Sequence, residues 1–163
     1  MLSAKMQEAL NKQINAELYS SYLYLSMSAH FESASLKGFA HWLRVQAGEE
    51  RGHAEKFLDH INDRGGRVTL LAVQAPPAEW ASPLAAFEEV YRHEQKVTGL
   101  INDLVNMAVA ERDHASNEFL QWFVKEQVEE EAQSLQIVQA LRRVGESAGG
   151  LLVLGHHLGK RGQ

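Results

Sequence analysis

Prolines and clustered glycines, which interrupt helices most strongly, lie in a few short stretches of this chain. Prolines occur only at Pro76, Pro77 and Pro83, and glycines cluster at residues 65–66 and again from Gly145 onward. Between these stretches, apolar residues recur every three or four positions, which is typical of amphipathic helices. The pattern predicts four long helices, over about residues 3–31, 36–64, 83–111 and 113–144. Residues 67–73 alternate weakly, and we assign them to a connection.

Local signals mark the ends of these segments. Ser82 precedes Pro83, an order that favours the start of a helix. Gly145 follows the last segment, where glycine commonly ends a helix. Ser33 and Ser35 are the expected N-terminal caps of the second segment. The predicted boundaries therefore depend on capping chemistry as well as on periodicity.

The lengths of the connections determine how the helices are ordered in a bundle. Joints of a few residues after Phe31 and after Glu111 require antiparallel neighbours. The middle connection, from Gly65 to Ala81, can span roughly 55 Å at about 3.3 Å per residue. A helix of about 28 residues is only roughly 42 Å long, so this connection can cross the bundle and join parallel helices. The predicted fold is an all-α four-helix bundle with up-down-down-up topology.

The composition excludes several classes of protein. The 163 residues suffice for one domain with a substantial core, and the absence of cysteine excludes disulfide scaffolds, thiol catalysis and cysteine-based metal sites. The net charge of −5, with scattered lysine and arginine, argues against a nucleic-acid partner. The start has no signal-peptide pattern, and no apolar run is long enough to span a membrane. We therefore expect a cytoplasmic protein with no membrane partner.

An acidic residue interrupts the apolar seam of each predicted helix. The inner face of a bundle follows an alternating spacing of three and four residues. On that spacing, Glu17, Glu50, Glu94 and Glu130 take positions otherwise suited to packing. Each lies near the middle of its helix, and His53 lies one turn beyond Glu50. The sequence therefore predicts a buried layer that contains four carboxylates and an imidazole.

Such a layer requires positive charge from outside the chain. A buried ionised carboxylate without a partner costs roughly several kcal/mol, and no seam supplies a lysine or arginine near this level. Cations from solution are the remaining source. A site rich in oxygen with a single imidazole suits Fe2+, Fe3+ or Mn2+ better than an ion that prefers thiolates. Glu50 and His53 can reach one ion together, while Glu50 also bridges to a second.

These positions lie within motifs that resemble those of the non-haem ferritins of bacteria and archaea. The motifs extend over nearly the whole chain and are Gln13-Ile14-Asn15-Ala16-Glu17 with Tyr24, Glu49-Glu50-x-x-His53, Glu94, and Glu126-Gln127-x-Glu129-Glu130. In ferritin-like di-iron proteins, two helices each supply one Glu, and the other two each supply a Glu-x-x-His pair. The second helix of this chain matches the pair, whereas the fourth departs from it.

The resemblance implies a set of site residues. The expected ligands of one iron ion are Glu17, Glu50 and His53, and those of the other are Glu50, Glu94 and Glu130. A third iron site would consist of Glu49, Glu126, Glu129 and Glu130. Gln127 would be a hydrogen-bonding partner, and Tyr24 corresponds to the tyrosine beside the di-iron centre of the family.

The resemblance also implies an activity and an assembly. The expected function is that of an iron-storage subunit and ferroxidase, which oxidises Fe2+ with O2 or peroxide and deposits ferric mineral in a homo-oligomeric shell of 24 subunits. No haem is expected. The tail with Leu151-Leu152-Val153-Leu154 is similar to the short fifth helix of ferritins. The expected organisation is a bundle over residues 1–145, followed by a short C-terminal helix and tail over 146–163.

Other classes of protein fit the sequence less well. A bacterioferritin would be expected to carry His in place of Glu130 and a haem-binding Met where this chain has Arg51. A rubrerythrin-like peroxidase would require a cysteine-rich segment, and DNA-protecting mini-ferritins lack a fifth helix. The alternative from a different class is a metal-free helical interaction protein whose acidic residues lie on the surface.

Overall fold

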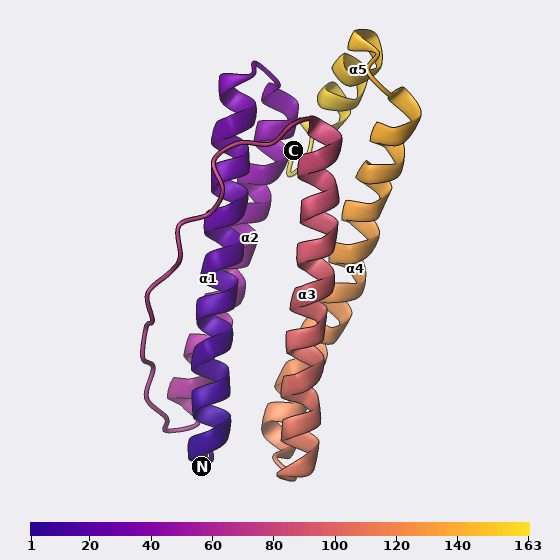
Figure 1. Ribbon diagram of the computed structural model, residues 1–163. Coiled ribbons are helices and arrows are strands. Elements are labelled where there is room, and N and C mark those ends of the chain that lie inside the picture. Colours follow the sequence, from indigo (N-terminus) through magenta and orange to yellow (C-terminus); the bar gives the residue numbers. More distant parts are fainter.

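The computed structural model describes residues 1–163 as five helices without a strand. The helices are α1 (Ala4–Ser33), α2 (Lys37–Asp63), α3 (Pro83–Ala110), α4 (His114–Val144) and α5 (Ala148–Leu158). The four long helices lie side by side, with α1 against α2 and α3 against α4, and α5 lies at one end of the bundle (Figure 1). This confirms the predicted all-α bundle with a short fifth helix. None of the helices has the combination of length and apolar character needed to cross a membrane.

The long connection between α2 and α3 runs along the outside of α1 from one end of the bundle to the other (Figure 1). Polar side chains of α1 form hydrogen bonds with the backbone of this connection. The Asn11 amide donates to the Arg67 carbonyl at 3.0 Å and accepts from the Thr69 N–H at 2.7 Å. Ser26 donates to the Pro77 carbonyl at 2.6 Å. These bonds satisfy peptide groups of a segment that has no ladder or helix of its own, and the up-down-down-up topology follows from its path.

The ends of the helices match the predicted signals, with one exception. Ser82 accepts a hydrogen bond from the Ala85 N–H at 3.0 Å, and Gly145, with a φ of 55°, ends α4. The expectation that Ser33 and Ser35 cap α2 is wrong. Ser33 is the last residue of α1, and Ser35 has a φ of 59°, so Leu36 precedes α2 without a side-chain cap. Ser33 still belongs to α1, and its hydroxyl donates to the His30 carbonyl, whereas Ser35 takes part in the reversal of the chain.

The apolar core of the bundle consists of two separate clusters. One lies toward α5 and includes Tyr24, Phe39 and Phe87. The other lies toward the opposite end and includes Leu10 and Phe57. On every long helix, a buried polar residue separates the part in one cluster from the part in the other. The fold therefore places a polar layer across the middle of an otherwise apolar interior.

Candidate metal centre

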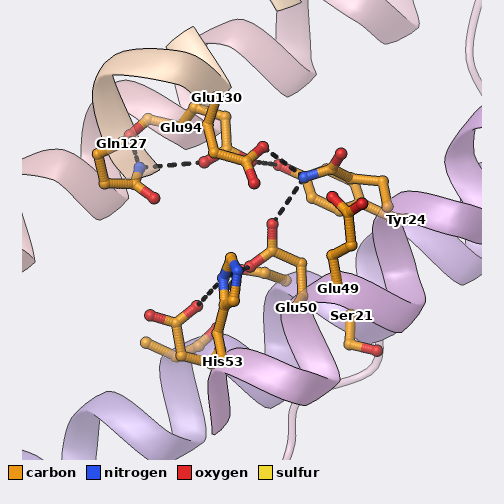
Figure 2. Close-up of polar contacts among 12 residues, drawn as sticks. Ser21, Tyr24, Glu49, Glu50, His53, Glu94, Gln127 and Glu130 are labelled. Atoms are coloured by element: carbon orange, nitrogen blue, oxygen red, sulfur yellow. Dashed lines mark hydrogen bonds and ion pairs between the residues drawn. The ribbon is translucent and has the colours of Figure 1, made fainter. Parts of the chain in front are cut away.

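The polar layer is formed by one glutamate from each long helix. Glu17 on α1, Glu50 on α2, Glu94 on α3 and Glu130 on α4 have side chains that are between 1% and 5% exposed. The four glutamates lie at the same height in the bundle because each occupies the middle of a helix and the helices lie side by side. Figure 2 shows Glu50 and His53 on one side of the layer, facing Glu94, Gln127 and Glu130 on the other.

Oxygen and nitrogen atoms in this layer lie close enough to share cations. Three groups have ligand atoms within 4.8 Å of one another, and they are Glu17 with Glu50 and His53, Glu50 with Glu94 and Glu130, and His53 with Glu126 and Glu130. The first two groups are the ligand sets expected from the sequence. Glu50 is common to both, so its carboxylate lies where it can bridge two ions. The third group does not have the expected composition.

Amide and phenol groups orient these carboxylates. Gln13 donates to Glu17 at 2.8 Å, and Gln127 donates to Glu94 at 3.1 Å. The Tyr24 hydroxyl donates to the other oxygen of Glu94. Gln46 donates to both Glu50 and Glu130, which joins carboxylates of α2 and α4. These neutral donors fix the direction of the acids but do not supply the charge that the layer needs.

The charge of the layer is not balanced within the chain. None of the four glutamates forms an ion pair with lysine or arginine, and the only basic side chain within 4.0 Å is His53. Its Nδ1 lies 3.1 Å from Glu50 and 3.9 Å from Glu17. The buried Glu17 Oε2 has no hydrogen-bond partner at all. Orphaned buried oxygens are rare in proteins and call for an explanation, and a cation held by the layer provides one.

Crowding changes the proton affinity of these groups. Burial, followed by repulsion from Glu50, raises the pKa of Glu94 to about 8 and that of Glu130 to about 9. The same two causes raise the pKa of Glu17 well above its usual value. Burial alone would lower the pKa of His53, but its hydrogen bond to Glu50 and the nearby carboxylates raise it. Without cations, the layer therefore holds protons at neutral pH, and a bound cation would have to displace them.

The residues expected at a third iron site are not all brought together. Glu126 is half-buried and belongs to the group with His53 and Glu130, and burial raises its pKa. Glu49 and Glu129 are exposed and belong to none of the three groups. Glu49 instead forms an ion pair with Arg161, with 2.7 Å between Oε2 and Nη2. The composition of this site therefore stays a proposal.

Two glutamines of the centre, Gln13 and Gln46, were not predicted as site residues, although Gln13 belongs to one of the ferritin-like motifs. Gln13 lies four residues before Glu17, and Gln46 lies four residues before Glu50. Side chains at that spacing lie on the same face of a helix, one turn apart. The repeated Gln-x-x-x-Glu spacing on α1 and α2 was therefore the available signal. The bond from Gln46 to Glu130 depends on how α2 and α4 pack, which no local spacing reveals.

Comparisons with known proteins agree with this arrangement. A sequence model of the Ferritin family, described as a ferritin-like domain, matches residues 7–144. The bacterial non-heme ferritin of Bacteroides fragilis is 45% identical over 161 residues, which cover 99% of this chain and 100% of that protein. The bacterial non-heme ferritin of Staphylococcus aureus is 38% identical and covers 99% of this chain and 97% of its own length.

Solved structures agree as well. The open pore ferritin from the hyperthermophilic archaeon Archaeoglobus fulgidus superimposes with a TM-score of 0.98 at 58% sequence identity, covering 99% of both chains. An engineered closed form of that ferritin has the same TM-score and identity, and covers 99% of this chain and 98% of its own. A family match over most of the sequence, relatives of nearly equal length and a superimposable fold lead to one conclusion: this chain belongs to the ferritin family.

Proposed function

We propose that this chain is an iron-storage ferritin subunit that oxidises Fe2+ at a di-iron centre inside its own four-helix bundle. The observation that carries the proposal is the buried layer of Glu17, Glu50, Glu94 and Glu130, which has no lysine or arginine to balance it. The family membership and the chemistry of the oxygen-rich ligand set both favour iron as the cation.

In this proposal, iron is the substrate, and two groups of side chains hold it. Glu17, Glu50 and His53 bind one Fe2+, while Glu50, Glu94 and Glu130 bind a second. The shared Glu50 carboxylate holds the two ions close together, so that both can give an electron to the same molecule of O2 or peroxide. Each Fe2+ loses one electron and becomes Fe3+, and the oxidant is reduced by two electrons for each pair of ions.

Neighbouring side chains restrain the carboxylates that hold the ions. Gln127 and Tyr24 bind opposite oxygens of Glu94, and Gln46 links Glu50 to Glu130. Carboxylates restrained in this way rotate less when the ions arrive, and partners of this kind commonly change metal affinity or activity 10- to 100-fold, as an order of magnitude. Glu126 lies at the edge of the layer, where it can receive Fe3+ that leaves Glu130.

We also propose that the chain assembles with copies of itself into a hollow shell of 24 subunits that stores the ferric product. Apolar side chains remain exposed on α1 and on the connection beside it, at Tyr22, Leu25, Leu70 and Leu71. Further exposed apolar residues, Leu152 and Val153, lie on α5. Apolar surface of this extent indicates contact with other subunits.

The proposal predicts two results from one preparation of protein. Aerobic addition of Fe2+ to the apoprotein should produce ferric absorbance faster than buffer alone. Sedimentation should give a particle of about 440 kDa, as expected for 24 chains of 18.2 kDa. Oxidation no faster than in buffer would contradict the ferroxidase function. Monomers at both low and high salt would contradict storage in a shell, whatever the rate of oxidation.

A further inference from the structure

The residues after α5 return to α2 and place Arg161 against it. The Arg161 guanidinium lies 4.3 Å from the centre of the Trp42 ring, and its Nη1 donates to the Trp42 carbonyl at 3.4 Å. Its Nη2 lies 2.7 Å from Oε2 of Glu49. The Arg161 side chain is only 16% exposed. A planar guanidinium is well suited to such a position, because it can stack on an aromatic ring and bind a carboxylate at the same time.

Contacts that do not involve Glu49 hold this tail in place. His41 Nε2 donates to the Arg161 carbonyl at 2.8 Å, and Leu158 is buried in the apolar cluster at this end of the bundle. The backbones of α2 and α5 touch at Gly38 and Gly155, where a Cβ on Gly38 would lie 1.7 Å from the Gly155 carbonyl oxygen. Because these contacts anchor the tail independently, Arg161 fixes the position of Glu49 rather than following it.

Glu49 has no other partner in the structure. Its carboxylate makes a single side-chain contact, to Arg161, and is 43% exposed. It directly precedes Glu50, the carboxylate common to two of the ligand groups, yet it joins none of the three groups. The neighbouring group of His53, Glu126 and Glu130 is complete without it. The only contact that restrains the Glu49 carboxylate in its position outside these groups is the ion pair with Arg161.

We propose that Arg161 is a positioning residue that holds Glu49 away from a third cation beside the di-iron centre and competes with that cation for the carboxylate. The inference rests on the proposed function, because the third cation would lie next to Glu126 and Glu130. The ion pair holds Oε2 of Glu49, so a cation that recruits this carboxylate has to compete with Arg161, and the pair weakens binding at this position alone. By linkage, a third cation that captures Glu49 loosens the contact of the tail with α2.

The test measures Zn2+ binding, because Zn2+ is not oxidised and reports occupancy without turnover. Calorimetric titration of the metal-free, assembled protein would compare wild type with Arg161→Met, which keeps a long apolar side chain on Trp42 but removes the charge. We expect the third Zn2+ to bind about threefold to tenfold more tightly to the variant, as the loss of a partly exposed ion pair implies. The first two Zn2+ ions should bind as in wild type. Arg161→Lys, which keeps the charge but not the planar stacking group, should fall between the two.

Two further variants show whether the effect passes through Glu49. In a Glu49→Gln background, Arg161→Met should no longer change the affinity for the third Zn2+. The carboxylate that Arg161→Met would release has been replaced there by an amide. Arg142→Met serves as the matched control, since Arg142 forms an ion pair of the same 2.7 Å with Glu88 on α3. That substitution should leave all Zn2+ affinities unchanged.

The outcomes separate this inference from the proposed function. If the first two Zn2+ ions bind and Arg161→Met leaves the third affinity unchanged, or no third ion binds to either protein, the role of Arg161 is overturned while the di-iron centre stands. An equal effect of Arg161→Met with and without Glu49→Gln would also overturn it. Absence of the first two ions from wild type would instead contradict the proposed function.

Discussion

Replacing Glu50 with alanine is expected to lower the rate of Fe2+ oxidation by about 100-fold or more, because partners of the ligands alone commonly change activity by 10- to 100-fold. Glu50 belongs to both ligand groups of the proposed di-iron centre, so its loss would affect both ions and the bridge between them. The measurement is the initial rise of ferric absorbance after aerobic mixing of Fe2+ with apoprotein.

Two controls separate chemistry from folding in this experiment. Glu50→Gln keeps the volume and the hydrogen bond from Gln46 but removes the charge, so it should be nearly as slow as Glu50→Ala. Glu55→Ala removes an exposed glutamate of the same helix, paired only with Arg51, and should oxidise Fe2+ at the wild-type rate. Wild-type rates in both Glu50 variants would contradict the assigned bridging role.

Replacing Glu130 with glutamine is expected to stabilise the metal-free protein at neutral pH while weakening the stabilisation by metal. Burial raises the pKa of Glu130 from 4.5 to about 9. A group whose pKa is raised by folding contributes its stability fully below the unfolded pKa and loses it as the pH rises toward the folded pKa. At pH 7, the wild-type carboxyl must gain a proton on folding, which costs about 3 kcal/mol at about 1.36 kcal/mol per pH unit. Glutamine, which resembles the protonated acid, avoids this cost.

Scanning calorimetry of the apoprotein tests this expectation. The midpoint of Glu130→Gln should lie roughly 6–12 °C above wild type at pH 7, and the difference should vanish near pH 4.5. Added Zn2+ should raise the wild-type midpoint more than that of the variant. Glu129→Gln changes an exposed neighbour and should stay within about 0.5 kcal/mol of wild type. A loss of stability in Glu130→Gln that is the same at both pH values would contradict the account.

Much of the fold follows from short-range features of the sequence. The apolar spacing gives the four long helices, Ser82 and Gly145 mark two of their ends, and the connection after Gly65 is long enough for the crossover. Ser33 and Ser35 show where this reasoning fails. A serine before a helix often caps it, but here Ser33 is still part of α1 and Ser35 lies in the tight reversal between α1 and α2.

The candidate site likewise contains some features that the sequence predicts and others that it does not. Helical spacing placed Glu17, Glu50, Glu94 and Glu130 in the core, and their burial is a consequence of that spacing. The contacts of Gln46 with Glu130 and of Arg161 with Glu49 join segments that are far apart in sequence. Their existence depends on the packing of α4 and of the tail after α5 against α2, which periodicity within one helix does not determine.

The central claim is that multivalent cations neutralise the buried glutamates. It is tested most directly by a crystal structure of the protein soaked with Fe2+ without oxygen, with diffraction recorded at the iron absorption edge. We predict two anomalous peaks in each subunit, one bounded by Glu17, Glu50 and His53 and the other by Glu50, Glu94 and Glu130. Glutamates without iron between them, in crystals that hold iron only at other places, would contradict the account.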